Sequence, residues 1–359
     1  MWQRPSISVL KFILIALTGV FLGSCGESGG GGPMGVKPPS MGKIYQVNTL
    51  VSPETYNSSV LDTFDFRFGR AYPLLPQPEP FFDLRYYEIN ELDQQPIMRR
   101  LKCFLVLADM SLEDELADMV RKDFRDSEDF TESGVKIGRN KWAQDQVIIY
   151  IYGPDQASLI EEINRSYLSV SSRIEEYYQN MIQSTVFVQG QNTSVQDTIR
   201  QKFGIDMEIP ADFVTALETD SLIWLRQEIP DISRSILVSR FAYTDPDQFQ
   251  EPGIIRMRDR MGRYVSSTIE GTYMKVNNVD LPTFVHRTDQ LEGAFAAKAE
   301  GIWEIEGDFL GGPFVSYAIL DEDNQEVVYI DGFVYSPEKK KKMSMIYLDY
   351  ILRQSRLHP

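Results

Sequence analysis

The sequence predicts an α+β protein, with antiparallel sheets that carry helices packed on one face. Short apolar runs such as LKCFLVL (101–107) and VIIYIYG (147–153) have the length and residue types of strands. Between Pro154 and Met181, apolar residues recur every three or four positions, which indicates an amphipathic helix. Each half of the chain then repeats the order strand, helix, Trp-led strand and helix. This order suggests two duplicated α/β-sandwich halves.

Residues 1–24 resemble a signal peptide. Arg4 and Lys11 flank the start of an apolar run that ends in Leu22-Gly23-Ser24-Cys25, and a Gly-rich segment follows directly. Small residues before a Cys are what a lipoprotein signal peptidase requires, so we expect Cys25 to carry a lipid and to become the N-terminus. The alternative is an ordinary signal peptide with an incidental Cys. Gly26 rather than Asp follows Cys25, which favours the outer membrane.

Residues 25–42 are rich in Gly and Pro and are expected to form a flexible tether. The remainder divides into an N-terminal α+β half (43–190) and a C-terminal α+β half (191–359), or forms one continuous domain. The formal net charge is −16 and becomes two units more negative once residues 1–24 are removed. Such a body repels phosphate backbones, so nucleic acid is not an expected partner. Cys103 lies on the apolar side of its strand and is expected to be buried and free.

In the N-terminal half, residues 43–69 show no regular pattern. Pro76, Pro78 and Pro80 impose an extended path into an aromatic strand. Apolar strands are expected at 100–108 and 147–153, with a helix after Ser111 and Asp114 and a long helix opened by Pro154.

In the C-terminal half, a short helix closed by Gly204 precedes strands near 207–217, 222–229 and 235–243. A helix is expected from Pro252 to Tyr264. The polar string DEDNQE (321–326) predicts a hairpin turn, and Gly311-Gly312-Pro313 predicts a tight turn. Lys339 to Lys342 open the last helix, where positive charge opposes the helix dipole, and we expect this turn to be solvated.

Four segments resemble the signature strings of an uncharacterised lipoprotein family of Bacteroidota, known as domain of unknown function 4837. They are LLPQPEPFF (74–82), RNKWAQDQ (139–146), SLIWLRQE (221–228) and GIWEIEGDFLGGPF (301–314). The likeness extends from about residue 71 to residue 352, and Leu310 stands where the family has Met. The resemblance implies an envelope lipoprotein and brings no activity or catalytic residues.

The strongest candidate ligand site is the stretch around Trp303. If this stretch is extended, Glu304, Glu306 and Asp308 project on one face beside the indole. Paired carboxylates beside an aromatic ring are typical of a glycoside hydrolase, but the same alternation is typical of a half-buried strand with a solvated face. We favour the strand.

A second candidate is a cationic stripe on the predicted helix 252–264, formed by Arg256, Arg260 and Arg263. It suits an acidic ligand, although pairing with Asp245, Asp247 or Glu251 is the favoured interpretation.

The sequence offers little support for a metal site or a catalytic nucleophile. His286 has no Cys, second His or nucleophile elbow nearby, and His358 is the penultimate residue and is expected to fray. We therefore expect no metal and no cofactor. The favoured function is a non-enzymatic lipoprotein that binds or scaffolds an envelope protein or glycan. The alternative is a carbohydrate-active hydrolase that uses the carboxylates of 304–308, which would need to face each other across a cleft at about 5–10 Å.

Overall fold

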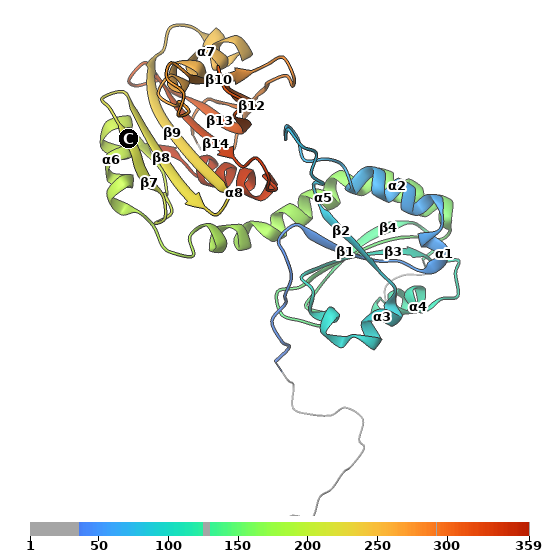
Figure 1. Ribbon diagram of the computed structural model, residues 1–359. Coiled ribbons are helices and arrows are strands. Elements are labelled where there is room, and N and C mark those ends of the chain that lie inside the picture. The colour runs from blue at the N-terminus through green and yellow to red at the C-terminus, as the bar shows by residue number, and fades with distance from the viewer. Residues whose placement is uncertain (1–35, 125–129, 292, 359) are drawn as a thin grey trace, which may run out of the picture. The chain divides into compact units, whose positions relative to one another are not determined.

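Two β-sheets and a two-stranded ribbon organise the chain (Figure 1). The computed structural model describes residues 36–124, 130–291 and 293–358, so Cys25 and the signal segment lie outside the described residues. One sheet has five strands and the other has eight. Both carry helices, which confirms the mixed α and β class.

The five-stranded sheet has the order β2-β1-β3-β5-β4 and is mostly parallel. Strand β1 pairs in parallel with β2 and β3, and β3 pairs in parallel with β5, whereas β4 is antiparallel to β5. Every residue of β3 and β5 is buried, and such continuous apolar strands are typical of parallel sheets covered on both faces. The strands are β1 Gln46–Leu50, β2 Asp83–Tyr87, β3 Cys103–Asp109, β4 Gly134–Arg139 and β5 Val147–Gly153.

Helices cover both faces of this sheet rather than one. The long α5 packs with α2 against Cys103, Leu105 and Leu107, while α4 packs on the opposite face against Phe104 and Val106. Successive residues of a strand point to opposite faces, so one apolar run serves both cores. The helices are α1 Pro53–Tyr56, α2 Ser59–Phe68, α3 Ile89–Gln94, α4 Glu115–Asp123 and α5 Gln156–Val186, with a 3₁₀ turn at Pro96–Arg100.

The stretch 43–69 is regular, contrary to expectation. It holds β1 and α2, and the buried face of α2 is formed by Val60, Leu61, Phe64 and Phe68. This spacing is helical, but the helix is short and amphipathic over only ten residues, which made the pattern easy to miss. The segment expected to be a flexible tether (25–42) ends before residue 42. Gln144 N donates a hydrogen bond to Pro38 O at 2.8 Å, and Met41 N donates one to Arg100 O at 2.7 Å.

The eight-stranded sheet is antiparallel, with the order β10-β12-β13-β14-β9-β8-β7 and β11 paired with β12. Helices α6 and α8 pack on one face and α7 packs on the other. The prediction of antiparallel pairing is therefore correct for this sheet. The five-stranded sheet has a different strand order, which argues against a duplication of the two halves. The strands are β7 Val214–Glu218, β8 Leu222–Ile229, β9 Ile232–Ala242, β10 Tyr273–Asn277, β11 Phe284–Thr288, β12 Ala296–Glu306, β13 Gly311–Asp321 and β14 Glu326–Tyr335. The separate two-stranded ribbon is formed by β6 Ile205–Asp206 and β15 Arg356–Leu357. The helices are α6 Thr193–Phe203, α7 Glu251–Gly262 and α8 Lys342–Arg353, with a 3₁₀ turn at Pro246–Phe249.

Two turn predictions in this sheet had different outcomes. The DEDNQE hairpin is confirmed, since Asp321 pairs with Glu326 across the β13–β14 turn. Gly311 and Gly312, in contrast, belong to strand β13, and the turn lies before them at Gly307 (φ 85°). A Cβ on Gly312 would lie 2.1 Å from the carbonyl oxygen of Val334, so the glycine is needed for close strand approach.

The basic run before α8 is solvated only in part, because Lys339 and Lys340 are exposed whereas Lys341 and Lys342 are buried. The Glu79 carboxylate accepts hydrogen bonds from Lys341 N (2.5 Å) and Lys342 N (3.3 Å), and it offsets the helix dipole. Lys342 Nζ donates to Pro80 O and Phe81 O. The Pro-rich segment therefore caps the last helix.

Cys103 is fully buried and has no disulfide partner among the described residues, as expected. Burial raises the pKa of its thiol to about 12, so the reactive thiolate is suppressed. Within the described part of the chain, no helix is both long enough and apolar enough to cross a bilayer.

Candidate functional site

Trp303 lies inside the sheet rather than on a ligand-facing surface. Its side chain belongs to the core cluster under α7, with 4 % of the residue exposed. The ring packs edge-on against Phe333 at 5.4 Å between centroids. The indole is therefore covered and presents no platform for a sugar ring.

The carboxylates next to Trp303 are held by a neighbouring strand. Lys275 of β10 forms ion pairs with Glu304 and Glu306, and Asn277 Nδ2 donates to Glu304 at 2.7 Å. Asp308 lies in the following turn, where it accepts a hydrogen bond from Phe309 N. Glu304 and Asp308 thus occupy a strand and a turn, and both strand carboxylates already share one lysine as their ion-pair partner.

Arg256, Arg260 and Arg263 are exposed on α7, and none forms an ion pair with any described residue, contrary to the favoured interpretation. Arg260 lies over the Phe241 ring and Arg263 over the Tyr273 ring instead. The same helix carries Arg258, which the sequence analysis did not single out. Arg258 is fully buried and pairs with Asp331 of β14 at 3.0 Å.

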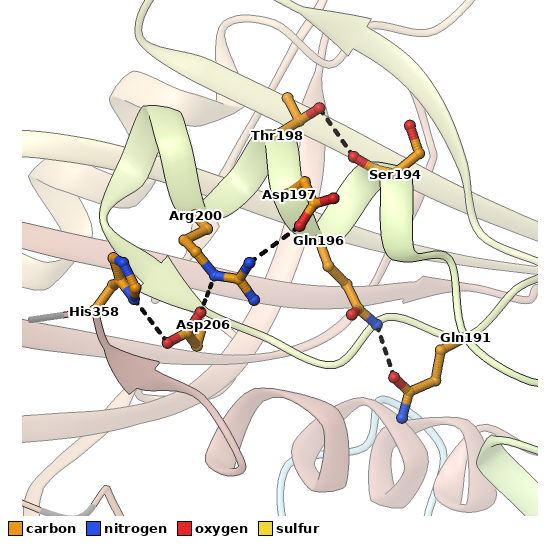
Figure 2. Close-up of polar contacts among 8 residues, drawn as sticks. All are labelled: Gln191, Ser194, Gln196, Asp197, Thr198, Arg200, Asp206 and His358. Carbon is orange, nitrogen blue, oxygen red and sulfur yellow. Dashed lines mark hydrogen bonds and ion pairs between the residues drawn. The ribbon is translucent and has the colours of Figure 1, made fainter.

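His358 is anchored rather than frayed. Its backbone N–H donates to Gly204 O at 2.8 Å, and Nδ1 lies 3.1 Å from Asp206 Oδ2 (Figure 2). Burial opposes ionisation of Asp206, but hydrogen bonds from Arg200 and His358 outweigh it and lower the pKa of this carboxyl. β15 pairs with β6 beside this cluster, so the cluster fastens the C-terminal strand.

A different set of charged residues converges on a pocket that we call the central polar pocket. It has a volume of about 180 Å³ and is lined by residues of α5, β12, α8 and the segment 72–81. Its charged members are Glu175, Lys298, Glu300, Asp349 and Arg353.

Lys298 is the centre of this set. Its Nζ lies 3.2 Å from Glu300 Oε1 and 2.9 Å from Asp349 Oδ1, and 13 % of its side chain is exposed. The Tyr317 hydroxyl donates to Asp349 at 2.8 Å and also lies 3.1 Å from Gln290 Oε1. Lysine, carboxylates, hydroxyl and amide therefore form one connected network at the pocket wall.

The pKa shifts in the pocket follow from burial beside charge. Burial lowers the pKa of Lys298, but the attraction of Asp349 and Glu300 outweighs it and the net shift is upward. Burial raises the pKa of Glu175, and Arg70, Arg353 and Lys298 offset this only in part. Groups with shifted pKa values in a pocket are typical of functional sites, although structural ion pairs produce them too.

Aromatic rings form the opposite wall. Tyr72 and Phe81 are stacked at 5.7 Å between centroids, and Tyr45 contacts Phe81 edge-on at 5.8 Å. Burial raises the pKa of Tyr72 well above its ordinary value, so its hydroxyl stays protonated and can donate a hydrogen bond. Rings on one side and hydrogen-bonding groups on the other suit a small polar ligand.

The sequence contained one signal for this pocket. Lys298 and Glu300 interrupt the strand AAKAEGIW with charges, and a charged residue in an otherwise apolar strand needs a buried partner or a solvated face. Asp349 and Glu175 carried no such signal, because polar residues are ordinary on helices. In the parts of the chain that the structure describes, no group of three His, Cys, Asp or Glu side chains is arranged to hold a metal ion.

Comparisons with known proteins divide the chain near residue 190. Residues 192–354 match the family described as Domain of unknown function (DUF4837), and residues 40–187 match Domain of unknown function (DUF8532). No curated protein matches the chain. Two solved structures, a mutant of the protein Mog1 and the Saccharomyces cerevisiae Ran-binding protein Mog1p, are each 13 % identical and have a TM-score of 0.28. Each match covers 43 % of this chain and 90 % of the other, and a TM-score this low does not establish a shared fold.

The family resemblance expected from the sequence is thus confirmed for the C-terminal part, which carries SLIWLRQE and GIWEIEGDFLGGPF. The strings at 74–82 and 139–146 fall instead in the segment that matches the second family. Residues 192–354 are similar to one family of unknown function and residues 40–187 to another.

Proposed function

We propose that this protein is a lipid-anchored component of the cell envelope that binds a polar ligand in the central polar pocket without transforming it. The observation that carries the proposal is the network at Lys298, where a largely buried lysine and two carboxylates line a pocket that aromatic rings also line, and a buried tyrosine hydroxyl holds one of the carboxylates from behind. Even a paired buried charge commonly stabilises the folded state less than well-packed apolar side chains would. This cluster therefore costs stability relative to an apolar wall. Recognition of a polar ligand would account for this cost.

The pairing of the charges favours binding over catalysis. Lys298 is shared by Glu300 and Asp349, and Asp349 also accepts from Tyr317, so each of these three charges already has a partner in the unliganded protein. A hydrolase at Glu304 and Asp308 has less support, since Lys275 holds Glu304 and the Trp303 ring is covered.

The lipid anchor is proposed from the sequence. Leu22-Gly23-Ser24-Cys25 follows an apolar run, and acylation of Cys25 would hold the body at a membrane, with Gly26 favouring the outer one. Labelling with an alkyne fatty acid should mark the wild type and not Cys25→Ser. Equal labelling of both proteins would refute the anchor, and fractionation with the inner membrane would refute the membrane assignment.

The binding proposal is tested with a pair of matched lysine variants. Lys298→Gln removes the charge in the pocket, and Lys275→Gln removes the lysine that bridges two carboxylates on the exposed surface. The full-length lipoprotein in phospholipid nanodiscs is incubated with envelope extract, and the retained material is analysed by mass spectrometry and sugar analysis. We expect a component that the wild type and Lys275→Gln retain and that Lys298→Gln loses while its circular dichroism spectrum stays native. Equal retention by all three proteins would place the binding site elsewhere.

A further inference from the structure

We propose that the central polar pocket is one end of a longer groove that binds a glycan chain; this rests on the proposed function and names its ligand class. The pocket shares Glu175, Gln179, Gln290 and Arg353 with a neighbouring pocket of about 490 Å³. That pocket shares Gln354 and Arg356 with a third, of about 440 Å³. Pockets with common wall residues form a path rather than isolated hollows, so a ligand longer than one residue can be accommodated.

Glutamine side chains line this path along its length. The six are Gln179, Gln183, Gln191, Gln196, Gln290 and Gln354, contributed by α5, α6 and segments outside the helices. An amide both donates and accepts hydrogen bonds without carrying charge, as a sugar hydroxyl also does. Repeated amides along a groove therefore match repeated hydroxyls along a chain.

Several of these amides are fixed so that one end remains available. The Gln179 oxygen accepts a hydrogen bond from Arg353. Figure 2 shows Gln196 on α6 directed at Gln191, with 3.2 Å between Nε2 and Oε1. Holding a carbonyl oxygen leaves the amide nitrogen as a donor, and holding the nitrogen leaves the oxygen as an acceptor. Such orientation lowers the entropy lost on binding.

Two polar atoms in the groove wall lack partners. Arg353 Nε and Ser355 Oγ are buried and form no hydrogen bond with any described residue. Unpaired buried polar groups are costly, but both atoms are closed off from solvent, so a ligand in the groove would reach them only if the surrounding side chains moved.

The charges and apolar surface of the groove distinguish a glycan from other ligands. Acidic residues such as Glu175 and Glu208 alternate with basic residues such as Arg200 and Arg353, so neither sign dominates. A polyanion would meet the carboxylates, and a protein interface would need a larger apolar anchor than Met207 and Tyr350 supply. The rings of Tyr72 and Phe81, which stack on each other, line the far end of the groove and add apolar surface beside its polar groups.

The test uses envelope extract that is pretreated in two ways and then incubated with the full-length protein in phospholipid nanodiscs. The nanodiscs avoid detergents with sugar headgroups, which would compete for the site. Periodate cleaves the vicinal diols of sugars, and protease digests proteins. We expect periodate pretreatment, after quenching, to abolish the Lys298-dependent retention and protease pretreatment to leave it unchanged. The opposite pattern would show a protein ligand and would overturn the glycan assignment while the binding proposal stands. No retention by the wild type would remove both.

The groove itself is tested by a double variant. Gln183 and Gln354 are exposed and have no side-chain hydrogen bond to a described residue, so Gln183→Ala with Gln354→Ala should fold normally. We expect its half-maximal retention of the periodate-sensitive component to require about tenfold more extract, the loss expected for one or two hydrogen bonds. Gln201→Ala, on the exposed surface of α6, is the matched control and should bind as the wild type. Wild-type retention by the double variant would confine binding to the central polar pocket and overturn the longer groove.

Discussion

Near each end of strand β12, a lysine forms ion pairs with two carboxylates. Near its start, Lys298 holds Glu300 and Asp349, and their side chains are 13 %, 25 % and 18 % exposed. Near its end, Lys275 of the neighbouring strand holds Glu304 and Glu306, and these side chains are 34 %, 37 % and 48 % exposed. Each cluster joins one lysine to two carboxylates, Glu300 and Asp349 in the first and Glu304 and Glu306 in the second. Only the covering elements differ, because α8 and the segment 72–81 close over the first cluster.

The difference shows why carboxylate spacing alone was a poor guide to the site. A solvent-exposed ion pair contributes little to the free energy of folding, because water and salt screen the attraction. A partly covered pair interacts more strongly, and breaking it is costly. The same strand therefore supplies an ordinary solvated face at one end and a candidate ligand site at the other.

The largest effect is expected at Trp303, which lies between the two clusters. Trp303→Ala should lower the free energy of unfolding by about 3–5 kcal/mol, because a buried aromatic ring is replaced by a cavity. Urea unfolding measures this, and Trp303→Phe should lose less because it fills most of the space. A Trp303→Ala protein that melts within a degree or two of the wild type would show that the ring is not part of the core.

Variants of the two lysines should differ in their free energy of unfolding. Lys298→Met leaves two partly buried carboxylates without their cation and should cost about 1–3 kcal/mol. Lys275→Met should stay within about 0.5 kcal/mol of the wild type, as exposed substitutions do. Paired urea melts measure both, and equal losses would mean that covering by α8 makes no energetic difference.

A smaller effect, dependent on pH, is expected at Glu175. Burial raises the pKa of this carboxyl in the folded protein, so the unfolded chain releases the proton at lower pH than the folded protein does. The folded state is then penalised as the pH rises through that interval. Glu175→Gln should match the wild type in strongly acidic buffer and be more stable at pH 7, as thermal melts across pH would show. A variant that is less stable than the wild type at pH 7 would indicate that Glu175 is stabilised by its cationic neighbours instead.

The smallest effects are expected at the carboxylates first singled out from the sequence. Glu304→Gln and Asp308→Asn should each change stability by only a few tenths of a kcal/mol, because both positions are partly exposed. Retention of the envelope component should also be unchanged. If either amide abolished retention while the melting curve stayed intact, the exposed end of β12 would be the functional one.

Local patterns in the sequence determined the mixed α and β class, the long helix α5, the buried Cys103 and the hairpin at 321–326. These depend on periodicity and turn residues within a few positions, which a sequence displays directly. The lipid anchor at Cys25 is likewise a local motif, and it stays a prediction because the residue lies outside the described part of the chain.

Only the tertiary structure decided which charged residues meet. Glu79 caps α8 across 262 positions of sequence, Arg258 finds Asp331 across 73, and Lys298 joins Asp349. The parallel order of the five-stranded sheet and the second covered face were equally hidden, because strand pairing depends on which distant segments bury each other's apolar surface. A charge on a helix or strand looks the same in sequence whether water or another helix covers it. Its partner and its burial, and therefore the candidate site, are set by packing between segments far apart in the chain.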